Sequence, residues 1–137
     1  MKSIFTKIAA VLAFIIGAMA VFAGVKVLLG NDPGYYVINW LPIYNYTAGI
    51  LTVFITAILI WCGGKLGWFA GVTTFIAHTL VMIILQSAYN DVVAVDSIRA
   101  MTIRMIAWAI IQGLMFIQSL KNKKNKKLQT SLNEARS

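Results

Sequence analysis

Four long apolar segments constrain the fold of this chain more than any other feature of its sequence. A helix needs about 20 apolar residues, within a range of about 17–25, to cross the hydrocarbon core of a bilayer. No segment shows the ten-residue alternation that is typical of a membrane β-barrel. The sequence therefore predicts an all-α fold, a four-helix transmembrane bundle in residues 1–120, with spans at about 7–29, 46–62, 66–89 and 97–120.

Composition agrees with a membrane protein of one domain. Hydrophobic residues make up 60% of the 137-residue chain and charged residues 12%, whereas a soluble domain carries about 25% charged residues. The first segment has a second interpretation as a secretory signal, because Lys2 and Lys7 precede its apolar core and "AMA" at residues 18–20 resembles a cleavage site. Signal cores run about 7–15 residues. This core is longer, which favours a retained helix.

The lysines and arginines predict the orientation of the bundle. Cytoplasmic loops carry an excess of Lys and Arg. Lys2, Lys7 and Lys65 lie on one side, together with the tail at 121–137, whereas the loop at 30–45 has neither Lys nor Arg. We therefore expect both termini in the cytoplasm, and a bacterial inner membrane as the location.

The basic tail accounts for much of the net charge of +8. Lysines directly after an apolar span are typical of a segment that binds anionic lipid. We do not expect a nucleic-acid partner, because the tail lacks interleaved aromatic residues and a fold to present it. The tail, residues 121–137, is predicted to be mobile and held to lipid by Lys121, Lys123, Lys124, Lys126 and Lys127.

Polar side chains within the predicted spans indicate a candidate ligand site. His78 and Gln86 are eight residues apart on the third segment, and Arg104, Trp108 and Gln112 follow each other at intervals of four on the fourth. Residues four apart share a face of a helix, and the two segments must be antiparallel neighbours. If the faces meet, they form one polar patch for a small anion or a quinone-like carbonyl: His78, Gln86, Arg104, Trp108 and Gln112.

A structural interpretation of the same residues stays open. Arg104 could extend towards the headgroups or pair with Asp91 or Asp96. The role of His78, Gln86 and Gln112 could be limited to hydrogen bonds that join helices. Asp96 or Ser97 is expected to cap the fourth helix. The charges at the outer mouth of the bundle are Lys26, Asp91, Asp96 and Arg99.

Cofactor and metal chemistry find little support in the sequence. One cysteine, Cys62, and one histidine, His78, exclude a disulfide within the chain and a bis-histidine haem. We expect no metal site, and a quinone is the one cofactor that the polar patch could accept. No nucleophile–base pair or acid pair suggests an enzyme.

The end of the first segment, "FAGVKVLLG" at Phe22 to Gly30, resembles the "aG-x-K-x-L-x-G" turn of DoxX-like small four-helix membrane proteins. The resemblance covers about nine residues. It implies a four-helix bundle, an association with respiratory or redox membrane complexes, and a role for Lys26.

Two functions follow from these features. Small residues along the first segment, among them Gly17 and Gly24, permit close helix contact. They favour a non-catalytic accessory subunit or scaffold with a membrane-protein partner, or a homo-oligomer. The alternative is a binder or carrier of a small anionic or quinone-like ligand at the polar patch.

Overall fold

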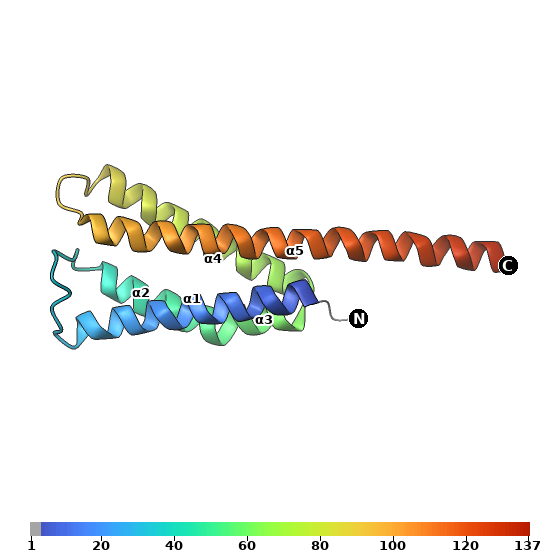
Figure 1. The fold of residues 1–137 in the computed structure, drawn as a ribbon, viewed down its shortest axis with the longest axis horizontal. Coiled ribbons are helices and arrows are strands. Elements are labelled where there is room, and N and C mark those ends of the chain that lie inside the picture. The colour runs from blue at the N-terminus through green and yellow to red at the C-terminus, as the bar shows by residue number, and fades with distance from the viewer. Residues whose placement is uncertain (1–3) are drawn as a thin grey trace.

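A computed structural model describes residues 4–137, and every regular element within that range is helical (Figure 1). Four helices are long and apolar enough to cross a membrane, as predicted. They are α1 (Ile4–Leu28), the continuous helix formed by α2 (Leu41–Leu51), the π-helical turn η1 (Thr52–Thr56) and α3 (Ala57–Cys62), then α4 (Lys65–Ser87) and α5 (Val95–Arg136).

The second helix begins five residues before the predicted start of its span. Pro42 lies in its first turn, where a missing backbone N–H breaks no helical hydrogen bond. The connection after α1 is therefore limited to residues 29–40. We call the end of the bundle that carries this connection the loop end. Tyr44 and Asn45, expected in the loop, are helical residues.

The fourth helix also differs from its prediction, because α5 continues past residue 120 to Arg136 (Figure 1). The tail contains neither Gly nor Pro, and most of its residues are Lys, Leu, Gln, Glu, Ala or Arg, which have good helix propensity. Every residue from 119 to 137 is exposed. The helical conformation of the tail therefore follows from local propensity and from continuity with the membrane span.

Helices α1 and α2 pack closely because small residues line their contact. A Cβ atom on Gly24 would lie 2.8 Å from the carbonyl oxygen of Pro42, and one on Gly49 would lie 2.7 Å from the backbone nitrogen of Val21. Such distances are too short for a side chain. Gly17 and Gly24 of the first helix are thus used for contact with the second helix of the same chain.

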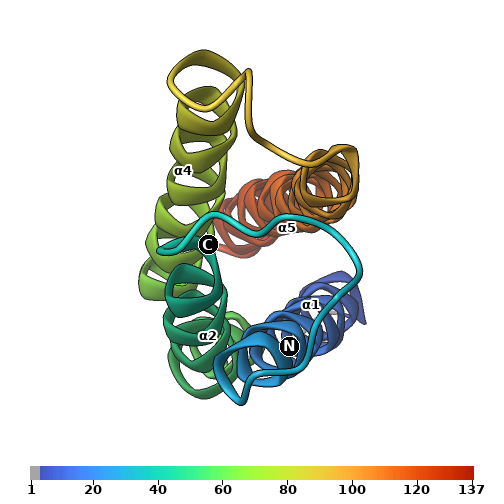
Figure 2. The same ribbon diagram turned by 90° about the vertical axis from the view of Figure 1, so that its left-hand side faces the viewer.

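The remaining helices close the bundle beside this pair. Close packing joins α1 to α5, α4 to α5, and α3 to α4. Viewed from the loop end, residues 29–40 cross in front of the space between the α1–α2 pair and the α4–α5 pair (Figure 2). The buried apolar residues form two clusters, one containing Trp108 and Ile111 and the other, nearer the loop end, containing Leu85 and Met101.

Candidate functional site

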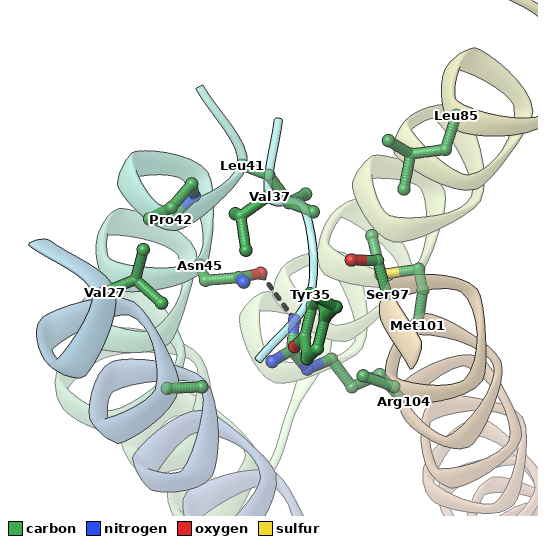
Figure 3. Close-up of a pocket in the computed structure, with 12 residues that line it drawn as sticks. Val27, Tyr35, Val37, Leu41, Pro42, Asn45, Leu85, Ser97, Met101 and Arg104 are labelled. Carbon is green, nitrogen blue, oxygen red and sulfur yellow. Dashed lines mark hydrogen bonds between the residues drawn. The ribbon is translucent and has the colours of Figure 1, made fainter. Parts of the chain in front are cut away.

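Arg104 lies inside the bundle, nine residues after the start of α5 and thus about 14 Å along the helix. Its side chain is only 9% exposed. The guanidinium Nη1 donates a hydrogen bond to Oδ1 of Asn45 on α2, at 2.5 Å (Figure 3). Within residues 4–137 no carboxylate pairs with it. The expected pairing of Arg104 with Asp91 or Asp96 is wrong, because its hydrogen-bond partner is Asn45.

Two consecutive residues of α2 connect the site to two different helices. Asn45 accepts from Arg104 on α5, and the Tyr44 hydroxyl forms a hydrogen bond with Nδ1 of His78 on α4. Consecutive side chains on a helix are about 100° apart, so a single turn of α2 reaches both partners. These two bonds span the space between the α1–α2 pair and the α4–α5 pair.

His78 joins the site to the apolar interior. Its side chain is 3% exposed, and its ring stands edge-on to Trp108, with the ring centroids 6.2 Å apart. The Tyr44 ring lies edge-on to His78 at 5.7 Å. Trp108 is fully buried, and its indole nitrogen has no hydrogen-bond partner among the described residues. Trp108 therefore packs edge-on against the His78 ring inside the bundle.

A cavity of about 60 Å³ lies beside the Arg104 guanidinium, on the side towards the loop end. Tyr35, in the connection after α1, lies next to the guanidinium in Figure 3. The cavity thus combines one buried cation with neutral hydrogen-bonding groups and an apolar wall. Its polar side chains are Tyr35, Asn45, Ser97 and Arg104, and its apolar wall includes Val27, Leu85 and Met101.

The structure does not bring all five predicted site residues together. Arg104, His78 and Trp108 are buried neighbours, but Gln86 is exposed. Eight helical residues turn through about 800°, so Gln86 is offset by about 80° from His78. Leu85 lies seven residues after His78, an interval of about 700° that nearly completes two turns. Leu85 therefore takes the buried position that was predicted for Gln86.

Gln112 is offset from Arg104 by the same angle and lies nearer the chain termini. A Cβ atom on Gly71 of α4 would lie 2.7 Å from the Gln112 side-chain nitrogen. The Gln112 amide is enclosed there without a hydrogen-bond partner among residues 4–137. Gln112 therefore packs between α4 and α5, apart from the Arg104 cavity.

The four charges predicted for the outer mouth are all exposed and do not line the cavity: Lys26, Asp91, Asp96 and Arg99. The expected cap of the fourth helix is also wrong. Ala94 is the capping residue of α5, without a side-chain hydrogen bond, and Asp96 lies in the first turn. A carboxylate in that turn still interacts favourably with the helix dipole.

Sequence reasoning missed three contributors to the site: Tyr35, Tyr44 and Asn45. The tyrosines lie near a predicted membrane boundary, where such rings commonly act only as anchors. Pro42 was the available signal, because a proline in the first turn of a helix would have placed Tyr44 and Asn45 inside the span. Nothing comparable marks Tyr35, which belongs to an irregular connection.

In the described part of the chain, no group of three His, Cys, Asp or Glu side chains lies close enough together to hold a metal ion. Comparisons of the chain with protein-family models, with curated proteins and with solved structures found no match.

Proposed function

We propose that the protein is a membrane-embedded, non-enzymatic binder or carrier of a small anion, a carboxylate or a phosphate group, with Arg104 as the cation of the site. One observation carries the proposal. Arg104 is buried in a bundle whose described residues give it a neutral hydrogen-bond partner and a small cavity, but no carboxylate partner.

The energetics of a buried arginine support a ligand. A charged side chain at the centre of a membrane helix costs about 2.5–3.5 kcal/mol on the insertion scale. A guanidinium has five N–H donors, and Asn45 accepts from one of its nitrogens. Fixed charge and a planar fork of donors make arginine well suited to carboxylate and phosphate groups. An anion in the cavity would offset the charge and use the remaining donors.

The size of the cavity favours an anionic group over a quinone. A water molecule needs a cavity volume of about 10–15 Å³, so a cavity of about 60 Å³ accepts a group of a few heavy atoms. The substituted ring of a quinone is larger. The apolar wall at Val27, Leu85 and Met101 suits a short alkyl chain attached to the anionic group.

The scaffold interpretation keeps less support than the ligand site. It depended on the small residues of the first helix, and these pack against α2 of the same chain at Gly24 and Gly49. Such residues point to close contact within the bundle and not to a separate partner. An accessory role in a membrane complex stays a prediction.

The proposed orientation places the cavity in the half of the bilayer away from the cytoplasm. The excess of Lys and Arg at the end opposite the loop end supports cytoplasmic termini. A bacterial inner membrane is the location that we propose. With this orientation the anion enters from the external side, near residues 29–40.

Thermal unfolding of the purified protein in detergent tests the proposal, with tryptophan fluorescence as the signal. The probes are sodium butyrate and inorganic phosphate, with butyramide as the neutral control and sodium chloride for ionic strength. A ligand at ten times its Kd stabilises the folded state by about 1.4 kcal/mol. We expect this stabilisation with at least one anion and none with butyramide.

Two arginines of the same helix provide the matched comparison. Arg104→Leu should abolish the anion-dependent stabilisation, and Arg104→Lys should weaken it because lysine lacks the planar fork. Arg99→Leu removes an exposed charge from α5 and should leave the stabilisation unchanged. An equal response of the Arg104→Leu and wild-type proteins, or no response of the wild type to either anion, would show that the proposal is wrong.

A further inference from the structure

A second concave surface lies on the exterior of the bundle, between α1 and α2. It is a groove of about 380 Å³, formed by apolar side chains. Phe22 and Phe54 flank it, and both are largely exposed. The groove is separate from the Arg104 cavity and shares no lining residue with it. Its floor and walls include Ala18, Val21, Val25 and Val53.

Local backbone geometry explains why a groove forms here. Gly17 brings α1 so close to η1 that an added Cβ atom would lie 2.9 Å from Thr52 and 3.0 Å from Val53. Val53 and Phe54 both belong to the π-helical turn η1. A π-helical turn displaces side chains from the regular α-helical spacing and frequently occurs at functional sites. The Ala18 side chain is short, which leaves the groove open.

A cation marks the loop end of this groove. Lys26 is exposed, and its Nζ lies 5.0 Å from the centroid of the Phe22 ring. Neither α1 nor the helix formed by residues 41–62 contains an acidic residue. The nearest carboxylate along the chain, that of Asp32, accepts a hydrogen bond from the Gly34 backbone nitrogen.

The dimensions match one leaflet of a bilayer. Eight residues separate Ala18 from Lys26, which corresponds to about 12 Å along α1. Half of the hydrocarbon core is about 15 Å thick. The groove therefore extends from the level of the lysine towards the middle of the bilayer, as an acyl chain does.

We propose that this groove binds one acyl chain of a phospholipid whose phosphate group pairs with Lys26. Apolar walls accept the chain, and the lysine complements the negative charge at the correct end. A second copy of α1 would instead bring a second Lys26 to the same region, and like charges oppose that contact. The proposal does not depend on the Arg104 site.

Native mass spectrometry of the purified protein, titrated in detergent with phosphatidylglycerol, tests this site. We expect one lipid to bind more tightly than the others. Lys26→Gln should weaken that first binding about fivefold, the effect expected for one lysine and an anionic lipid. Ala18→Leu fills the exposed groove without altering the core and should remove the tight site.

Matched substitutions lie on the same helix. Val11 is exposed seven residues before Ala18, on about the same face but outside the groove, so Val11→Leu should bind like the wild type. Lys7→Gln removes a lysine near the opposite end of α1 and should also have no effect. Equal binding by Ala18→Leu, Lys26→Gln and the wild type would overturn the proposal. So would a dimer that Ala18→Leu converts to a monomer, since that result makes a second copy the occupant.

Discussion

Replacing Asn45 by leucine should destabilise the bundle only while Arg104 is present. Asn45 supplies the hydrogen bond that the buried guanidinium forms within the described chain. A hydrogen bond to a charged group contributes about 1.5–3 kcal/mol, and removing one buried partner leaves the other unsatisfied. We therefore expect Asn45→Leu to lower the free energy of unfolding by about 1.5–3 kcal/mol.

The double variant should behave differently from the sum of the single variants. Replacing both partners of a buried polar contact by apolar groups of similar shape is nearly neutral or stabilising. Arg104→Leu also removes the desolvation cost of a buried charge, which is about 2.5–3.5 kcal/mol at the centre of a membrane helix and smaller nearer its end. The variant with Asn45→Leu and Arg104→Leu together should therefore lie within about 1 kcal/mol of the wild type, or above it.

The wild type, the two single variants and the double variant form a double-mutant cycle. Their unfolding by sodium dodecyl sulfate in mixed micelles, without added anion and followed by tryptophan fluorescence, measures it. The coupling energy between positions 45 and 104 should reach about 1.5–3 kcal/mol. Additive effects of the two single substitutions would contradict this expectation, because they would mean that Asn45 does not support the guanidinium. A double variant much less stable than either single variant would show that the polar pair holds the fold together.

Three further predictions concern the rest of the molecule and use the same unfolding assay, with circular dichroism for the third. Tyr44→Phe removes the hydrogen bond to His78 and should destabilise by about 0.6 kcal/mol, the mean for such bonds in membranes; a change above about 2 kcal/mol would contradict this. Gly24→Ala places a Cβ against the α2 backbone and should destabilise the bundle by about 1–3 kcal/mol. Gly113 has open space around it, so Gly113→Ala should stabilise the bundle by about 0.5–1 kcal/mol. Similar effects at both glycines would contradict the close packing inferred at Gly24. Deleting residues 124–137, all exposed, keeps the contact of Lys121 with the Phe5 ring and the hydrogen bond from Gln118 to Asn122. It should leave the stability of the bundle unchanged and remove helical signal, so a loss of stability would reveal a further contact made by the tail.

Much of the architecture could be predicted from the sequence because membrane spans are defined by length and apolarity. Arg104, His78 and Trp108 could be placed together because pairs four residues apart share a face and antiparallel neighbours align their levels. The same reasoning failed for Gln86 and Gln112, since intervals of four accumulate an offset of about 40° per step. Over two steps a residue leaves the face on which the series began.

The partners of the polar residues were harder to predict than the residues themselves. Asn45 contacts Arg104 across 59 positions of the chain, and no local pattern encodes such a pairing. The end of the fourth helix was misplaced for another reason. The predicted span stopped where the apolar run stops, whereas a helix that is already nucleated adds one hydrogen bond per residue as it continues. Apolar periodicity, which sets the ends of a predicted span, does not report that continuity.

The unbroken course of α5 has a mechanical consequence. Arg104 and Arg136 belong to one helix, and 32 residues of helix correspond to about 48 Å. A tilt imposed on the projecting segment turns the whole rod about the point where it leaves the bundle. That motion displaces the guanidinium relative to Asn45, which α1 holds through the close contacts of α2 at Gly24 and Gly49. Load on the tail would thus reach the cavity directly, as strain on a single hydrogen bond.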